Sequence, residues 1–121
     1  MAGLGRIPLS RRLPFPWRRW RVVLHVEAAD EVPDHLPRRT AVLVGPDQSP
    51  TWIALDCPCQ LHHRLLINVD PSRQPFWRVT NTTRLTIAPS IDDTTPSRRC
   101  HFLLKQGRVK WVHNIDEEQN P

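Results

Sequence analysis

The sequence predicts a mainly β protein, a small single domain built of short antiparallel strands and hairpins. Its 121 residues are enough for one hydrophobic core and few for two. Thirteen prolines leave little room for long helices, and several short segments show the apolar patterns of strands. All three cysteines fall in two short clusters, which makes those clusters the first place to look for a site.

The strand-like segments follow one another along the chain, separated by polar turns. Residues 22–26 alternate at period two, and residues 40–44 form the continuous apolar run typical of a strand buried on both faces. Residues 28–39 and 89–99 are rich in turn-forming residues and are predicted to be loops, the first with at most one helical turn. Strands are expected at 22–26, 40–44, 51–55, 64–69, 76–80, 84–88, 100–104 and 109–112, the last two joined by a hairpin turn at 106–107.

The net charge of +5 is concentrated in an N-terminal arm, residues 1–21, which we expect to be disordered. The arm holds six of the 17 Lys and Arg residues and none of the 12 acidic ones, so the rest of the chain is close to neutral. Its mixture of Arg, Trp and Pro suits contact with an anionic membrane surface or with phosphates, and the alternative is a solvated leader or start-site extension. The β-rich domain is expected at 22–113, followed by an acidic tail at 114–121. No specific nucleic-acid site is predicted.

Nothing in the sequence indicates export or membrane insertion. There is no apolar run of about 18 residues, as a transmembrane helix needs. The N-terminus lacks the apolar core of a secretory signal peptide. We therefore expect a cytoplasmic protein with no transmembrane segment, in which cysteines more often bind metal or catalyse than form disulfides.

The two cysteine clusters predict a zinc site, because thiolate and imidazole are the ligands that zinc prefers. Residues two apart in an extended segment point to one side, so Cys57 and Cys59 can face one ion. Adjacent strand residues point to opposite faces, so Cys100 and His101 can both be ligands only at a bulge or before the strand begins. Buried free thiols with surface histidines are the alternative. The candidate zinc ligands are Cys57, Cys59, Cys100, His101 and His62, with His63 as an alternative to His62.

A series of short motifs runs in order through most of the chain. They lie at residues 52–59, 68–71, 77–80, 85–91, 100–104 and 107–111. Together they resemble a bacterial family of small domains encoded beside genes for ubiquitin-like proteins and their activating and conjugating enzymes, over residues 20–113. The resemblance implies a cytosolic bacterial or phage protein with a β-rich zinc-binding fold. It also implies a role in handling ubiquitin-like modifiers or their conjugation enzymes, for example as a peptidase that matures or removes the modifier.

Both clusters depart from the pattern of that family. The family typically reads Cys-Pro-Cys-Gly-Cys-Gly at the first cluster, whereas residues 60–62 here are Gln, Leu and His after Cys59. At the second cluster it typically reads Cys-x-Ser-His, whereas here Arg98 replaces the first Cys and Cys100 takes the Ser position before the matching His101. The metal site is therefore either rebuilt from a shifted set of ligands or lost.

The first functional hypothesis is a zinc-dependent peptidase acting on a ubiquitin-like protein. Zinc held by three protein ligands keeps one position for water and lowers the pKa of that water, which generates a nucleophile. Cys57, Cys59 and His101 would be the ligands. Asp92 or Asp93 would be the general base, although both fall in a predicted polar loop whose carboxylates are normally solvated.

The second hypothesis is a non-catalytic protein-interaction module. Zinc would then be a closed structural clip made by Cys57, Cys59, Cys100 and either His62 or His101, and it would contribute directly to folding. The third hypothesis is a thiol peptidase, in which a nearby histidine activates Cys100 as the nucleophile.

Residues outside the clusters have simpler explanations. Trp52, Trp77 and Trp111 fall on strand-like segments, which favours roles in the core or in cross-strand pairs. Ser90 follows Pro89 within one of the matched motifs, and a turn role explains it as well as a functional one.

Overall fold

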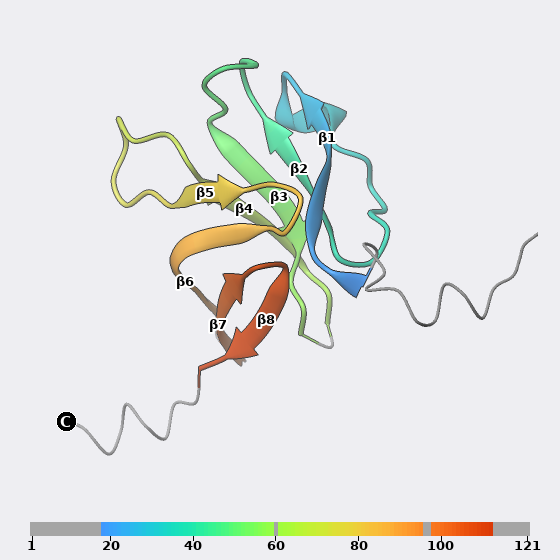
Figure 1. Ribbon diagram of the computed structural model, residues 1–121, viewed down its shortest axis with the longest axis vertical. Coiled ribbons are helices and arrows are strands. Elements are labelled where there is room, and N and C mark those ends of the chain that lie inside the picture. The colour runs from blue at the N-terminus through green and yellow to red at the C-terminus, as the bar shows by residue number, and fades with distance from the viewer. Residues whose placement is uncertain (1–17, 60, 96–97, 113–121) are drawn as a thin grey trace, which may run out of the picture.

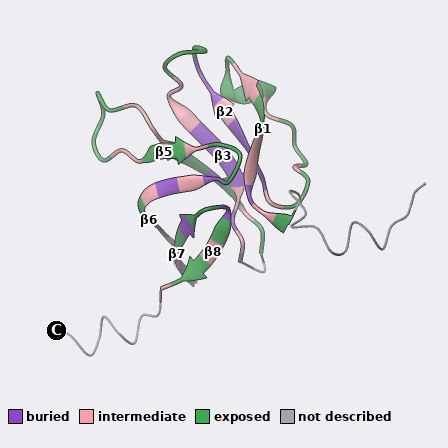
Figure 2. Ribbon diagram, in the orientation of Figure 1, coloured by how far each residue is buried: buried purple, intermediate pink, exposed green. Residues whose placement is uncertain are grey.

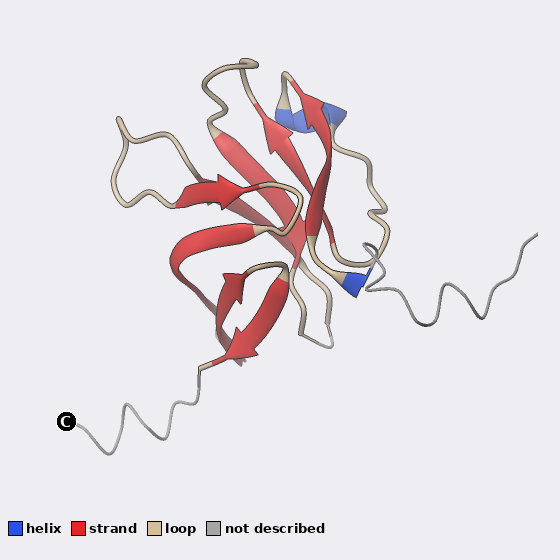
Figure 3. Cartoon of the chain, in the orientation of Figure 1, coloured by secondary structure: helices blue, strands red, loops and turns tan. Residues whose placement is uncertain are grey.

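The described part of the chain forms two four-stranded β-sheets. Figures 1 and 3 show the arrangement of their strands. The structure, a computed structural model, describes residues 18–59, 61–95 and 98–112, so most of the predicted arm and the predicted tail lie outside it. The strands are β1 (Arg21–Val26), β2 (Thr40–Val44), β3 (Trp52–Asp56), β4 (Arg64–Asn68), β5 (Arg78–Asn81), β6 (Thr86–Thr95), β7 (Arg98–Lys105) and β8 (Arg108–Trp111). The mainly β prediction is confirmed.

The first sheet has the strand order β1-β2-β3-β4. β2, β3 and β4 pair as antiparallel neighbours, but β1 and β2 are parallel, which the expected set of antiparallel hairpins does not include. Parallel neighbours need a crossover of about a dozen residues or more. Residues 27–39 supply it, and they contain the single helical turn expected there, the 3₁₀ helix η2 (Ala29–Glu31).

The second sheet has the strand order β5-β6-β7-β8, with antiparallel pairing throughout. The predicted loop at 89–99 is wrong, because β6 continues to Thr95 and pairs with β7 from Arg98 onward. The polar residues that suggested a loop belong to a ladder in which Ile91 is buried at 3% exposure while Asp92 faces outward. Strand pairing therefore overrides the local turn preference of these residues.

The main core lies between the two sheets. It joins Ile53 and Leu55 of the first sheet to Phe102 and Leu104 of the second, all at most 1% exposed. Buried segments of both sheets are purple in Figure 2. Trp20 is also part of this core, so the fold begins before the end of the predicted 1–21 arm. Arg21, likewise assigned to the arm, opens β1.

A smaller apolar cluster covers the other face of β2 and β3. Val42, Val44 and Ala54 are buried there against Val32 and Leu36 of the crossover. β2 is thus buried on both faces, as its continuous apolar run predicts.

The β7–β8 turn forms at the predicted dipeptide. Gln106 and Gly107 both have positive φ, at 55° and 77°, as the tightest hairpin turns require. Glycine is also needed because a Cβ on Gly107 would lie 2.7 Å from the Cβ of Arg19. No helix in the described part of the chain is long and apolar enough to cross a membrane.

Candidate functional site

Three cysteines and one histidine converge at one end of the core. Cys57 and Cys59 lie in the β3–β4 connection, His63 directly precedes β4, and Cys100 comes from β7. Their ligand atoms all lie within 4.8 Å of one another, and the three cysteines are at most 5% exposed. The connection is closed by a hydrogen bond from the N–H of Cys57 to the carbonyl of His63. Residues from the two sheets therefore meet in one group, called the sulfur cluster below.

The sulfur cluster has the composition of a structural zinc site. Three thiols and one imidazole form one of the standard tetrahedral ligand sets for Zn²⁺. The Nδ1 atom of His63 lies 3.4 Å from the Sγ of Cys59, and its Nε2 lies 2.8 Å from the Oδ2 of Asp93. Zinc-bound histidines usually donate their second N–H to a carboxylate, which fixes the ring and its tautomer. The donors fit zinc, with Asp93 orienting the histidine.

The thiols of the cluster differ in acidity. Burial is the largest influence on Cys57 and on Cys100, and it raises the pKa of both thiols. Burial also raises the pKa of Cys59, but hydrogen bonds from the Leu61 backbone, the Cys57 side chain and other neighbours outweigh it and lower the pKa to about 7. In the metal-free protein Cys59 is thus the thiol that ionises most readily. A bound metal ion would hold all three as thiolates.

The histidine in the cluster is His63, which the sequence reasoning considered only as an alternative to His62. His62 has a positive φ of 52°, and its side chain lines a surface pocket beside Pro58. The reversed backbone at His62 lets the chain turn into β4 so that His63 faces the sulfur atoms. His62 therefore lies outside the group of converging donors.

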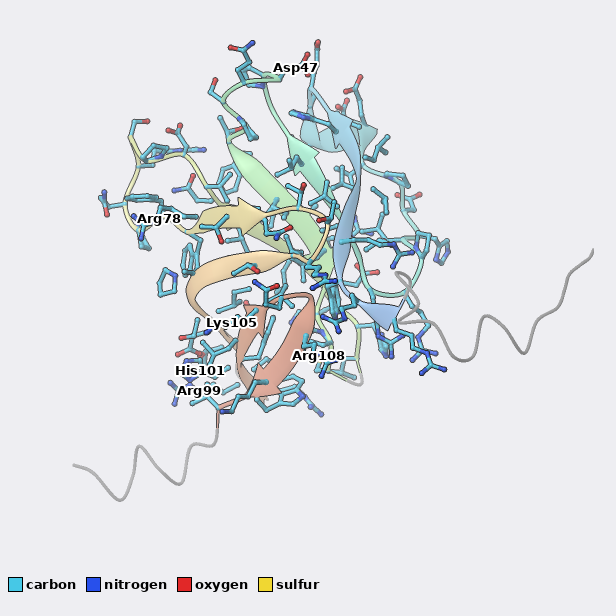
Figure 4. All side chains as sticks on the ribbon, in the orientation of Figure 1. Asp47, Arg78, Arg99, His101, Lys105 and Arg108 are labelled. Carbon is cyan, nitrogen blue, oxygen red and sulfur yellow. The ribbon has the colours of Figure 1, made fainter. Side chains whose placement is uncertain are left out.

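His101, also a predicted zinc ligand, lies outside the sulfur cluster too. β7 is regular at this point, so Cys100 faces the core at 2% exposure while His101 faces the other side of the sheet (Figure 4). The bulge that would let both act as ligands is not in β7. For the same reason the structure does not bring Cys100 and His101 together as a nucleophile and its base.

A second polar group lies on the outer face of the same two strands. The hydroxyl of Ser90 in β6 lies 2.9 Å from the Nε2 of His101 in β7, and both side chains are half-buried. We call these two residues the Ser–His pair. When Nε2 carries no proton, it accepts the hydroxyl hydrogen of Ser90, which is the contact between a serine nucleophile and its general base.

An irregularity in the strand ladder places Ser90. Between the paired positions Ile87 and Ile91 the register of β6 against β7 shifts, so β6 carries extra residues there. Such bulges re-aim side chains and are frequent beside active sites. The indole N–H of Trp77 donates a 3.0 Å hydrogen bond to the carbonyl of Ser90, and this bond holds the backbone of the bulge in place.

The two aspartates predicted as possible bases lie on opposite faces of β6. Asp93 contacts His63 of the sulfur cluster, whereas Asp92 pairs with His101 across the ladder. Asp92 binds Arg99 at 2.8 Å, and this hydrogen bond is the main reason that the pKa of Asp92 is lowered, with the nearby His101 acting in the same direction. Asp92 is thus a stable carboxylate beside the Ser–His pair.

The sequence analysis named Ser90 and His63 but did not assign either of them to the site. Ser90 stands 11 positions before His101, and the predicted loop at 89–99 hid the ladder that brings them together. The signal that was available is its place within a motif shared with the resembled family. His63 was underrated because the positive φ of His62 leaves no mark in the sequence.

Comparison with known proteins gives one family. The family model described as bacterial ubiquitination-like system serine protease (BubE) matches residues 28–112, which include the sulfur cluster and the Ser–His pair. Searches among curated proteins and among solved structures give no match. Because the family model covers most of the chain, the protein belongs to the BubE family of bacterial ubiquitination-like systems.

Proposed function

We propose that this protein is a serine protease that acts on the ubiquitin-like modifier of a bacterial ubiquitination-like system. Ser90 is the nucleophile and His101 is its general base. The observation that carries the proposal is the 2.9 Å contact between the Ser90 hydroxyl and the Nε2 of His101. It is supported by the family description, which names a serine protease rather than the zinc-dependent peptidase or thiol peptidase considered from the sequence.

The chemistry follows from this contact. Ser90 Oγ attacks the carbonyl carbon of the scissile bond while its proton moves to the Nε2 of His101. The imidazolium then protonates the leaving amine, and an acyl-serine remains. Water, deprotonated by the same histidine, releases the acyl group and restores Ser90.

Asp92 supports the histidine in this proposal without touching the substrate. It lies opposite His101 in the ladder, and its hydrogen bonds with Arg99 keep it ionised. A nearby negative charge favours the imidazolium that forms during catalysis. We therefore assign Asp92 a positioning and electrostatic role.

The sulfur cluster is assigned a structural role. Cys57, Cys59, His63 and Cys100 would hold Zn²⁺, which in such a site supplies folding free energy. Four protein donors around one ion leave no position for the water that a catalytic zinc activates. The metal would hold the β3–β4 connection against β7, on the face of β6 and β7 opposite to the Ser–His pair.

A fluorophosphonate probe tests the nucleophile, because such reagents label activated serines. Wild type should be labelled at Ser90, as read by peptide mass spectrometry, and Ser90→Ala should be neither labelled nor active. The activity assay uses the modifier of the same system fused at its C-terminus to a reporter protein. Labelling at another residue, or cleavage by Ser90→Ala, would overturn the assignment. An inert but folded wild type would instead favour the non-catalytic interaction module.

A further inference from the structure

A groove of about 420 Å³ lies between β4 of one sheet and β6 of the other, and it reaches Ile91, the residue next to Ser90. One wall is β4, and the other is formed by residues of β6 directly after Ser90. Trp77 closes one end, since its backbone N–H binds the carbonyl of Asn68 and its indole binds the carbonyl of Ser90. The residues that line the groove include Arg64, Leu66, Arg73, Trp77, Asp92 and Asp93.

The β4 wall presents unused backbone groups. β4 is the last strand of its sheet, and in the part of the chain that the structure describes it pairs with β3 alone. The carbonyl of His63 accepts a hydrogen bond from the β3 side, whereas the carbonyl of Asn68 binds Trp77 on the other side. Backbone groups alternate in direction along an antiparallel strand, so the N–H and C=O of Leu66 point into the groove with Asn68. The backbone of Leu66 makes no hydrogen bond on this side to any residue that the structure describes.

The β6 wall is open in the same way. Pairing with β5 ends at Ala88, so among the described strands the part of β6 from Ile91 onward pairs with β7 alone. The carbonyl of His101 binds the N–H of Val112 on the β8 side. By alternation, Cys100 and its partner Asp93 bond to each other, and the backbone of Asp92 faces away from β7.

The charged side chains of the groove already have partners within the protein. Arg64 binds Asp56 at 2.7 Å, and Arg73 lies 4.4 Å from the ring centroid of Trp52. The carboxylates of Asp92 and Asp93 bind Arg99 and His63. A ligand would therefore find little unpaired charge in this groove, whereas the β4 wall offers a row of backbone donors and acceptors.

We infer that the groove binds the substrate as an extended strand, paired through its main chain with the outer edge of β4. Addition of a strand to an open sheet edge is a general mode of peptide recognition. The occupant is the segment of the modifier that flanks the scissile bond, because two residues that line the groove, Ile91 and Trp77, adjoin Ser90 in the chain and through the indole hydrogen bond. This inference rests on the proposed function for the identity of the substrate, and it predicts selection for extended, unfolded segments over folded ones.

Binding is measured by fluorescence anisotropy with a labelled peptide from the C-terminus of the modifier. The Ser90→Ala variant is used so that no cleavage occurs. N-methylation of the peptide backbone, one residue at a time, should weaken binding at every second residue by about tenfold and leave the intervening residues near the parent Kd. A flat N-methylation profile would overturn the inference.

Two variants at one position test the protein side. Leu66→Pro removes the N–H that points into the groove and spares the bonds to β3, a change that edge strands tolerate. It should weaken peptide binding by about tenfold, whereas Leu66→Ala, which keeps the N–H, should change it by less than about threefold. Equal effects of both variants would contradict main-chain recognition. If Leu66→Pro does not fold, the N-methylation profile alone decides.

The two proposals fail in different ways. If the fluorophosphonate does not label Ser90 but N-methylation still acts at alternate residues, the strand-binding groove stands and the catalytic assignment falls. If Ser90 is labelled and the N-methylation profile is flat, the protease assignment stands and the groove inference falls.

Discussion

The sulfur cluster and the Ser–His pair lie on opposite faces of the same two strands. Cys100 and Asp93 face the first, and their neighbours His101 and Asp92 face the second. The three cysteines of the cluster are buried, and its four donors converge on one point. The Ser–His pair is half-buried, and the neighbouring β6 residues Ile91 and Asp92 line a groove. If the proposed roles hold, strands β6 and β7 serve stability on one face and chemistry on the other. Substitutions at adjacent residues should therefore change different properties, namely metal binding and stability on one face and activity on the other.

Metal removal should give the largest effect. If zinc holds the β3–β4 connection to β7, a chelator or Cys57→Ser should abolish cooperative unfolding or lower Tm strongly, because binding free energy of a structural zinc is folding free energy. Circular dichroism and calorimetry measure this, with metal content read by mass spectrometry. Val23→Ala, at an exposed position of β1, serves as the control and should change neither. An unchanged melting curve after chelation would show that the cluster holds free thiols.

His101→Ala should give the largest effect on activity without an effect on metal. Loss of the general base should lower kcat for modifier cleavage by about a thousandfold or more. Zinc content should stay at the wild-type level and Tm should change little, because His101 faces away from the cluster. If His101→Ala loses its zinc, the division between the two faces is wrong.

The strands were predictable because their signals are local. The continuous apolar run of residues 40–44 predicted a strand buried on both faces, and the dipeptide Gln106-Gly107 predicted a hairpin turn. The second half of β6 was not predictable in this way. Its Ser, Asp and Thr residues favour turns, and only the pairing with β7, a tertiary interaction, keeps them extended.

The sequence predicted the kind of ligands in the cluster better than it predicted which residues take part. The spacing of Cys57 and Cys59 indicated one shared ion, and strand alternation warned that Cys100 and His101 would diverge. The position of His63 in the cluster depends on the positive φ of His62. The position of Ser90 beside His101 depends on the bulge in β6. Neither feature has a signature in a single sequence, because both arise from how the strands pair.

The neighbouring aspartates allow a finer comparison. Asp93→Asn should lower zinc affinity by about tenfold to a hundredfold, as loss of a carboxylate behind a zinc-bound histidine does. Asp92→Asn should leave zinc affinity unchanged and lower kcat by roughly twofold to fivefold, the size expected of a half-exposed charge interaction. Competition with a zinc indicator and steady-state kinetics measure the two quantities. A loss of zinc affinity in Asp92→Asn equal to that in Asp93→Asn would mean that the hairpin responds as one unit.

The smallest expected effect separates two adjacent histidines. His62→Ala should leave zinc content, kcat and the free energy of unfolding near wild type, the last within about 0.5 kcal/mol, because the His62 side chain is not among the converging donors and its backbone N–H, which binds the carbonyl of Cys59, is kept. His63→Ala removes a donor and its bond to Asp93, so it should lose zinc and become less stable. Both variants shorten a histidine in the same connection, which makes them matched controls for each other. If His62→Ala lost zinc and His63→Ala kept it, the zinc ligand would be His62, and the assignment of His63 as the fourth ligand would be wrong.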